Sequence, residues 1–290
     1  MAESSDMRIV VLGNTGAGKS SMANTIFGHR DFKISHTLNS ETKKCQAETR
    51  SVSGRSITLV DTPGFFDTDR SEEELKPEIV RCITECAPGP HAFLIVLKVE
   101  KFTDHEQVGM NKIQEYFSEE AFKYATVVFT HGDDLPEGQT VEDFAEQNKL
   151  VSDLVKKCGG RCHVIDNKYW IDKPKEEYRS NQRQVEELLK TIVGMVTKNN
   201  GSCYTNEMLQ ATEEMIKQVK ENIGLSSRLF SKLFCKKMLT STYEPCRRMA
   251  FAQFDETDRE VVTAEDEKSG AQLVSDEHND VLAGPSLKQS

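Results

Sequence analysis

Five short apolar runs, separated by longer polar stretches, set the pattern of this chain. They are rich in β-branched residues, as strands buried in a parallel sheet are, and they cover residues 7–12, 56–60, 92–97, 125–129 and 163–165. Sequences typical of helix starts stand at Ser71, Thr103 and Thr140, and residues 185–196 carry apolar side chains at helical spacing. This alternation predicts an α/β fold: a doubly wound, mostly parallel sheet with helices on both faces.

The pattern changes towards the C-terminus. A second helical pattern begins near Met208, and a short basic amphipathic segment, residues 225–238, follows it. From Asp255 onward ten acidic and three basic residues accompany few apolar ones, a composition typical of disorder. We therefore predict an N-terminal tail, an α/β domain, a C-terminal helical extension and an acidic disordered tail, over residues 1–6, 7–200, 201–250 and 251–290.

The composition narrows the class of protein. The 290 residues carry a net charge of −10, which argues against nucleic-acid binding because phosphate contacts need a cationic face. No apolar run approaches the roughly 18 residues of a transmembrane helix, and the first six residues lack the basic and apolar parts of a signal peptide. With eight scattered cysteines, we expect a cytoplasmic chain with reduced thiols.

The strongest chemical signal follows the first apolar run, where the chain reads Gly-Asn-Thr-Gly-Ala-Gly-Lys-Ser. This is the phosphate-binding loop (P-loop), and strand, glycine-rich turn and helix come in the required order. The glycines let backbone N–H groups point at phosphates, Lys19 reaches the β- and γ-phosphate oxygens, and the Ser20 hydroxyl can ligate Mg²⁺. We therefore predict a nucleotide site with Mg²⁺ as cofactor. The predicted contacts from this region are Gly13, Asn14, Thr15, Gly16, Ala17, Gly18, Lys19, Ser20 and Ser21.

Two further segments are predicted to handle the γ-phosphate and the metal. Asp-Thr-Pro-Gly ends the second apolar run, so Asp61 is placed to hold Mg²⁺, usually through water, and the Gly64 N–H to bond the γ-phosphate. Loss of that phosphate would release the following segment, which is the basis of a switch. A first-switch threonine that ligates Mg²⁺ should lie in the polar stretch 31–50. We favour Thr42, and spacing alone leaves Thr37 open.

Guanine recognition is predicted after the fourth apolar run, which continues as Thr-His-Gly-Asp-Asp-Leu. GTPases commonly carry Asn/Thr-Lys-x-Asp here, and its carboxylate accepts both N1–H and N2–H₂ of guanine. Adenine has no donors at those atoms, so the carboxylate would be left unpaired and ATP rejected. The alignment favours Asp134 as the reader over Asp133. Gly132 stands where lysine is usual, and His131 replaces asparagine. A weaker signal, Asn167, offers a donor to guanine O6.

Taken together, the phosphate loop, Asp-Thr-Pro-Gly-Phe-Phe-Asp and Thr-His-Gly-Asp-Asp-Leu resemble the GTPases of immunity-associated proteins, the GIMAP or IAN family. Residues 89–97 with Phe102 and Thr103 resemble the box peculiar to that family, and residues 204–208 resemble its closing segment. The resemblance covers residues 6–220. It implies a septin-related GTPase fold, a homodimer through the nucleotide-binding face, and a role in lymphocyte survival or immune defence, often at intracellular membranes.

The resemblance also bears on catalysis. Many small GTPases orient the attacking water with a glutamine after Asp-x-x-Gly, whereas Phe65 stands there in this chain. The resemblance implies that members with high turnover supply an arginine from the family box across the dimer. Lys101 is the comparable residue, and a solvated surface lysine is the alternative interpretation. Because lysine lacks the planar two-pronged contact of arginine, we expect slow hydrolysis.

The expected function is a GTP-dependent switch or scaffold that binds GTP or GDP with Mg²⁺ and dimerises with nucleotide. Two other interpretations stay open. One is a hydrolase whose main task is turnover, and the other is a membrane-surface adaptor that uses residues 225–238 for peripheral contact with intracellular membranes.

Overall fold

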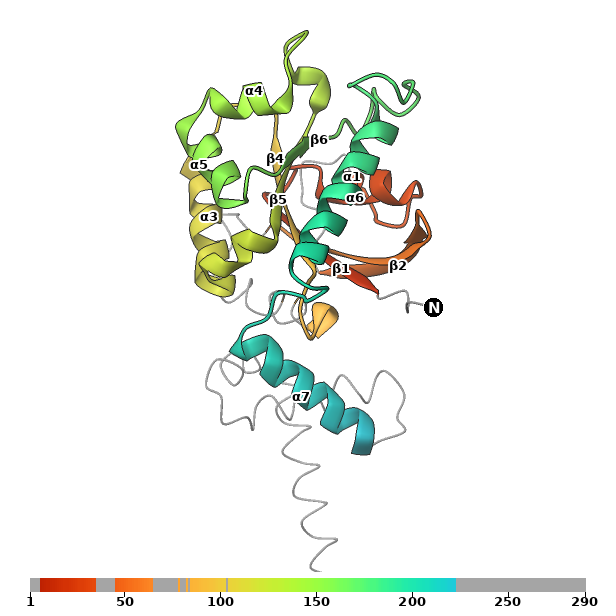
Figure 1. Cartoon of the computed structure of the whole chain (residues 1–290), viewed down its shortest axis with the longest axis vertical. Helices are drawn as coiled ribbons and strands as arrows, with labels where there is room; N and C mark the ends of the chain where they lie inside the picture. Colours follow the sequence, from red (N-terminus) through yellow and green to blue (C-terminus); the bar gives the residue numbers. More distant parts are fainter. Residues whose placement is uncertain are drawn as a thin grey trace, which may run out of the picture. The chain divides into compact units, whose positions relative to one another are not determined.

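The computed structural model describes residues 6–34, 45–64, 78, 82, 84–102 and 104–222 (Figure 1). Strands and helices alternate along most of these residues. In chain order the elements are β1 (Met7–Gly13), α1 (Lys19–Phe27), β2 (Gln46–Val52), β3 (Arg55–Asp61), β4 (Ala92–Lys98), α3 (Asp104–Phe117), η1 (Glu119–Tyr124), β5 (Ala125–Thr130), η2 (Gly132–Asp134), α4 (Val141–Glu146), α5 (Lys149–Lys157), β6 (Cys162–Val164), α6 (Asn181–Lys198) and α7 (Glu207–Asn222).

The six strands form one sheet in the order β2-β3-β1-β4-β5-β6. β1 pairs in parallel with both β3 and β4, and β5 and β6 continue the parallel part. The predicted fold class is therefore confirmed. The register places Val11 beside Asp61 and Gly13 beside Val96. Because parallel strands end at the same edge, the segments that follow β1, β3 and β5 gather there, as expected of a ligand site in such a sheet.

The edge strand β2 was not predicted. The polar stretch 31–50 was expected to carry a switch segment, yet its end forms the first part of β2, which pairs antiparallel with β3. Most of its side chains are exposed or half-buried, so the apolar alternation that marks a strand is missing. Pairing with a neighbour holds it instead, including a bond of 2.8 Å between the hydroxyls of Thr49 and Thr58. Both threonine candidates for the first switch lie outside the described residues.

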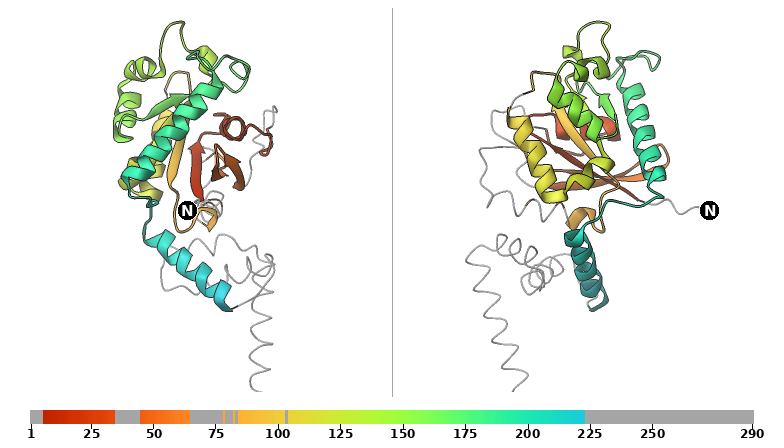
Figure 2. Two further views of the ribbon diagram at one scale, coloured as in Figure 1. Left: turned by 45° about the vertical axis from the view of Figure 1, so that its right-hand side comes forward. Right: turned by 60° about the vertical axis from the view of Figure 1, so that its left-hand side comes forward.

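Alternate side chains of the central strands form two cores, one on each face of the sheet. Figure 2 shows α3 and α6 on opposite sides of the strands. The core beneath α1 and α6 contains Ile9, Val11, Met22, Leu59, Leu94, Leu188 and Ile192. On the other face the ring of Phe93 lies 5.0 Å from that of Phe117 in α3, centre to centre, and Phe129 packs edge-on against Phe144 of α4. Both faces are therefore covered, as a parallel sheet requires.

His91 stands directly before β4 and is buried, with 8% of its surface exposed. Its ring Nδ1 accepts a hydrogen bond of 3.0 Å from the backbone N–H of Arg8, and the backbone N–H of His91 donates to the Arg8 carbonyl at 2.8 Å. Because Nδ1 accepts, the ring is neutral with its proton on Nε2. Burial lowers the pKa of His91 to about 4, and the positive charge of Arg8 acts in the same direction.

We expect acid to destabilise the protein partly through His91. The pKa falls from 6.5 to about 4 on folding, so this contribution to stability is present above pH 6.5 and is lost as the pH falls towards 4. A His91→Asn variant keeps an acceptor for the Arg8 N–H but does not titrate. Its free energy of unfolding should fall less over this interval, by about 1 to 3 kcal/mol. Urea unfolding at both ends of the interval measures the difference, and parallel pH curves would contradict the prediction.

Tyr204 anchors the chain after α6. It is 2% exposed, its N–H donates to the Pro90 carbonyl at 2.8 Å, and its hydroxyl bonds the Phe117 carbonyl. At the start of α7, Asn206 accepts a bond of 2.9 Å from the Leu209 N–H, as a helix cap does. A helix thus begins within the predicted extension, whereas the basic amphipathic segment and the acidic tail lie outside the described residues. The domain boundaries stay predictions.

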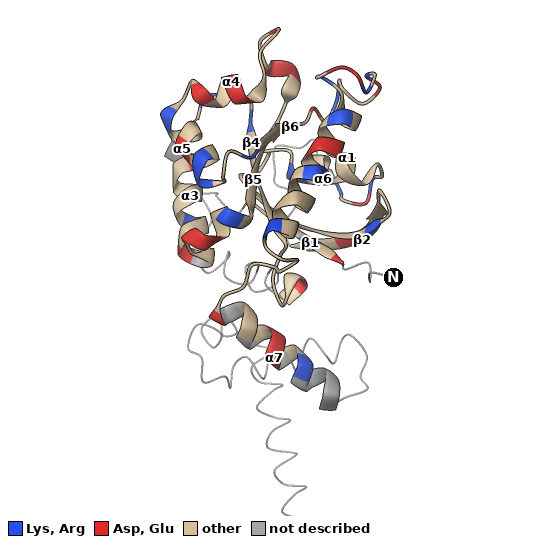
Figure 3. Cartoon of the chain, viewed as in Figure 1, with Lys and Arg blue, Asp and Glu red and all other residues tan. Residues whose placement is uncertain are grey.

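Charged residues of both signs share the surface of the described helices. In the view of Figure 3 basic and acidic residues are interspersed over α5 and α6, whereas the charged residues of α4 are acidic. Some are paired, as Arg183 is with Glu187 at 2.9 Å along α6. This mixture is typical of solvated helix faces. Within the described residues, every helix is too short or too polar to cross a membrane.

Candidate nucleotide-binding site

The phosphate loop joins β1 to α1 and closes on itself. The Ala17 N–H donates to the Asn14 carbonyl at 3.2 Å, and Gly18 precedes the helix with φ at 81°. A Cβ on Gly18 would lie 3.0 Å from Asn167 Nδ2 and 3.4 Å from Thr130 Cγ2. Both the left-handed backbone and the close neighbours therefore require glycine at this position.

Lys19 is the first residue of α1, and its side chain folds back over the loop. Its ammonium donates to the carbonyls of Gly13 at 3.0 Å and Asn14 at 2.8 Å. The residue is only 6% exposed. A largely desolvated cation held at a glycine-rich loop interacts strongly with an anion, because water screens it little. The predicted role of Lys19 as a phosphate contact agrees with this placement.

Ser20 and Asp61 meet beneath the loop. The Ser20 hydroxyl donates to Asp61 Oδ2 at 2.5 Å, and Asp61 is 1% exposed. Its other oxygen, Oδ1, has no hydrogen-bond partner among the described residues. Burial raises the pKa of Asp61, although the charge of Lys19 and the bond from Ser20 oppose the shift. A buried carboxylate with one unmatched oxygen, next to a hydroxyl, is the donor set that Mg²⁺ prefers. These two residues therefore fit the predicted metal site.

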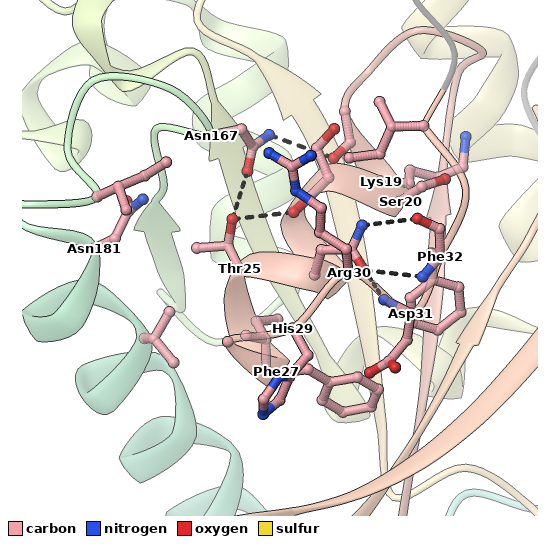
Figure 4. Close-up of a pocket in the computed structure, with 18 of the residues that line it drawn as sticks. Lys19, Ser20, Thr25, Phe27, His29, Arg30, Asp31, Phe32, Asn167 and Asn181 are labelled. Carbon is pink, nitrogen blue, oxygen red and sulfur yellow. Dashed lines mark hydrogen bonds between the residues drawn. The ribbon is translucent and has the colours of Figure 1, made fainter.

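The phosphate loop and Gly64, which follows β3, border one cavity of about 2110 Å³. Figure 4 shows Lys19, Ser20, Thr25 and Asn167 along it. Of the predicted contacts, Thr15, Gly16, Gly18, Lys19, Ser20, Ser21, Gly64, His131 and Asn167 line this cavity. The structure thus brings together segments up to about 150 residues apart in sequence at the edge of the sheet where ligands of α/β folds bind.

Asn167 is better placed than its weak sequence signal indicated. Its Oδ1 accepts a bond of 3.2 Å from the Thr25 hydroxyl, and its Nδ2 donates to the Gly18 carbonyl at 3.5 Å (Figure 4). The side chain therefore lies against the start of α1, on the predicted guanine side of the phosphate loop. A hydrogen-bonding amide in this position can serve a base or a ribose.

The predicted base-reading residues lie on η2, directly after β5. His131 has a left-handed backbone, with φ at 58°, and its Nδ1 lies 3.1 Å from the Thr130 hydroxyl. Asp133 and Asp134 are both exposed. The Asp133 N–H donates to Asp166 Oδ2 at 3.4 Å, and the Asp166 carboxylate raises the pKa of Asp133, with burial and Asp134 acting in the same direction. Because Asp133 interacts with Asp166, Asp134 stays the predicted reader.

Three contacts in the site had no usable sequence signal. The Thr130 hydroxyl donates to the Ala17 carbonyl at 2.8 Å and so ties β5 to the phosphate loop. The Asn14 amide donates to Glu106 of α3 at 2.8 Å. Thr25 holds Asn167, as described above. Each pair joins residues at least 92 positions apart, so only packing of the elements could reveal it.

Comparison with known proteins identifies the family. The sequence model of the AIG1 family matches residues 7–223, well over half of the chain. The chain belongs to the AIG1 family. The predicted family resemblance is thereby confirmed.

Curated relatives support this assignment. Immune-associated nucleotide-binding protein 8 of Arabidopsis thaliana is 36% identical to this AIG1-family chain over 228 residues, which cover 76% of the chain and 62% of the relative. Immune-associated nucleotide-binding protein 9 of the same plant is 33% identical, covering 71% and 60%. GTPase IMAP family member 8 of Homo sapiens is 32% identical, covering 70% and 29%. The matched part of the AIG1-family chain thus spans less than two thirds of the length of these relatives.

Solved structures share the fold. Toc33 from Arabidopsis thaliana in complex with GDP and Mg²⁺ has a TM-score of 0.52 at 20% identity, covering 67% of the AIG1-family chain and 85% of Toc33. A structure concerning the importance of dimerization for the GTPase activity of the chloroplast translocon components atToc33 and psToc159 has a TM-score of 0.54 at 20% identity, covering 66% and 83%. At this identity the likeness is one of fold.

Proposed function

We propose that this chain is a guanine-nucleotide-binding protein that acts as a GTP-dependent switch or scaffold and hydrolyses GTP slowly. One observation carries the proposal: Lys19 and Ser20 of the phosphate loop line the same cavity as His131 and Asn167 from the base side. Membership in a family whose relatives are named as GTPases and immune-associated nucleotide-binding proteins supports it. The same names support a role in immune-cell or defence functions.

In this proposal different residues bind the phosphates, the metal ion and the base of the nucleotide. Lys19 binds the β- and γ-phosphates, with N–H groups of the phosphate loop and of Gly64. Ser20 and Asp61 would hold Mg²⁺, whose bound charge offsets that of the phosphates. At the other end Asp134 accepts from guanine N1–H and N2–H₂, and Asn167 donates to the base. Thr42 would complete the metal site in the triphosphate state and lies outside the described residues.

An Asp134→Ala variant tests the base assignment. We expect it to lose most of its preference for GTP over ATP, a change of about 10- to 100-fold in the affinity ratio, because two charge-assisted hydrogen bonds are lost. Isothermal titration of GTP and ATP against both proteins gives the ratio. Asp133→Ala is the matched control and should keep the preference. If the wild type binds ATP as well as GTP, the proposed guanine specificity is wrong.

We also propose that the chain forms a homodimer through its nucleotide-binding face. The family resemblance supports this, and Lys101 stands exposed between β4 and α3, near the carboxyl edge of the sheet. In the dimer Lys101 would approach the phosphates of the partner's nucleotide and supply positive charge, without the planar fork of arginine. Phe65, at the place of the usual glutamine, cannot orient the attacking water, which accords with slow turnover.

Two measurements test the two parts of this proposal, the dimer and the role of Lys101. Sedimentation with a GTP analogue should show a dimer that GDP does not support. Lys101→Arg should raise GTP turnover by about tenfold or more, and Lys101→Ala should lower it, because a planar guanidinium stabilises the transferring phosphoryl group best. Lys123→Ala serves as control, since the Lys123 side chain is 66% exposed and forms an ion pair with the nearby Glu120. A monomer with every nucleotide would rule out the dimer, and equal turnover in all variants would rule out a role for Lys101.

A further inference from the structure

The loop between β6 and α6 contains one buried aromatic residue in an exposed setting. Trp170 is 2% exposed, whereas its neighbours Tyr169 and Ile171 are 55% and 59% exposed. Its carbonyl accepts a bond of 3.1 Å from the Asn181 N–H at the start of α6. The indole therefore points from a surface loop into the protein, where it packs against the backbone of η2.

The Trp170 ring occupies the space that a side chain at position 132 would need. A Cβ on Gly132 would lie 2.6 Å from Trp170 Cη2 and 2.9 Å from Cζ2. Real carbon atoms do not approach so closely without displacement. Gly132 lies in a 3₁₀ helix, a conformation that any residue adopts. The Trp170 ring, and not the backbone conformation, therefore requires glycine at position 132, where related motifs carry lysine.

Two other side chains of the same loop hold the same turn. Arg179 donates to the carbonyls of Leu135 at 2.7 Å and Pro136 at 2.8 Å, and its guanidinium lies 5.9 Å from the centre of the Trp170 ring. Asp166 accepts a bond of 3.4 Å from the Asp133 N–H. The loop therefore contacts the turn within η2 and directly after it, and Asp134 remains exposed at the end of η2.

The internal order of the loop is also well defined. The Asp166 carboxylate accepts from the backbone N–H of Lys168 at 2.8 Å and from that of Tyr169. The Asn181 side chain bonds the backbone of Asp166 on both sides, accepting from its N–H at 3.1 Å and donating to its carbonyl. These bonds place Trp170 between two anchored ends, so its ring can act as a fixed support.

We infer that Trp170 is a positioning residue for guanine recognition, which fixes the Gly132–Asp134 turn so that the Asp134 carboxylate faces the base edge. This inference rests on the proposed function. In the usual motif a lysine side chain accompanies the base-reading aspartate, whereas in this chain an indole from another loop takes its space against the turn. The two carboxylate bonds to guanine need both oxygens aligned, so a loosened turn would lose the bidentate contact before it loses phosphate binding.

The test compares two nucleotides that differ only at the base edge. Inosine diphosphate lacks the exocyclic N2 amine of GDP, so the GDP-to-IDP affinity ratio reports the Asp134 contact and not the phosphates. We expect a ratio of about tenfold or more in the wild type and a ratio below about threefold in Trp170→Ala. Trp170→Phe, which keeps an aromatic ring, should restore most of it. An equal loss of GDP and IDP affinity, or an unchanged ratio, would overturn the inference.

A double-mutant cycle separates positioning from a general loss of stability. Gly132→Ala inserts a methyl group into the indole and should lower the ratio. Combined with Trp170→Ala, the same methyl group has room, so the double variant should do no worse than Trp170→Ala alone. Additive losses would contradict the packing that the inference depends on.

The Asp134→Ala variant separates a failure of the inference from a failure of the proposed function. If Asp134→Ala keeps the wild-type GDP-to-IDP ratio, the proposed base reader is wrong. If Asp134→Ala loses the ratio while Trp170→Ala keeps it, only the positioning role of Trp170 is refuted.

Discussion

A Lys19→Ala variant is expected to bind GDP at least about 100-fold more weakly than the wild type, a loss of about 2.7 kcal/mol or more. Lys19 is 6% exposed, and its ammonium is held at the phosphate loop by two backbone carbonyls. Charge-assisted bonds from a desolvated donor to phosphate oxygens are among the strongest in proteins. Titration calorimetry with GDP measures the loss.

The matched control is Lys156→Ala. That lysine is on α5, its side chain is 74% exposed, and it forms an ion pair of 3.9 Å with Asp153 one turn earlier. Such a pair contributes little in water, so GDP affinity should stay at the wild-type value. Circular dichroism of both variants without nucleotide shows whether the fold is kept. Binding by Lys19→Ala within about threefold of the wild type would contradict the assignment of this loop as the phosphate site.

An Asp61→Asn variant is expected to lose the dependence of GTP affinity on Mg²⁺, which in the wild type should amount to about tenfold or more. The substitution keeps the shape but removes the charge that a divalent cation requires. The nucleotide-free protein should be as stable as the wild type or more stable, because burial raises the pKa of Asp61 and one of its oxygens has no hydrogen-bond partner among the described residues. A chelator titration of GTP affinity and a thermal melt without nucleotide measure the two effects.

Asp143→Asn should show the opposite signature. Its carboxylate accepts from the N–H and hydroxyl of Thr140 in the capping box of α4, and these bonds lower the pKa of Asp143. Removing the charge should therefore reduce stability at neutral pH and leave the Mg²⁺ effect untouched. If Asp61→Asn retains the full Mg²⁺ effect, Asp61 is not part of the metal site.

Much of the fold follows from patterns that are local in sequence. The buried strands are continuous apolar runs because both faces of the sheet are covered by helices. The Thr140 cap lies three residues from its partner Asp143, so it is visible in the sequence. β2 escaped notice because its side chains are largely exposed, and pairing with β3 alone makes it a strand. Its existence is a property of the assembled sheet.

The site shows the same division. Eight consecutive residues carry the phosphate loop, and Asp61 ends its own strand, so both could be predicted from neighbours in the chain. The choice between Asp133 and Asp134 could not be made so firmly, because adjacent residues differ only in the direction of their side chains. The contact of Asp133 with Asp166, 33 residues away, favours Asp134. In the sequence, glycine at position 132 is a departure from the usual motif, and the structure explains it by the ring of Trp170, which leaves no room for a side chain there.

The proposed ligand could be inferred along the chain, because a site for phosphate and magnesium needs a short run of glycine, lysine, serine and aspartate in a set order. The contacts that support the proposed base-reading turn are visible only in the folded structure. These contacts join residues 33 to 44 positions apart, and their formation depends on the order of β5 and β6 in the sheet and on the packing of the loop before α6. Such contacts leave no periodic mark, since each is a single side chain filling a space that another segment leaves open.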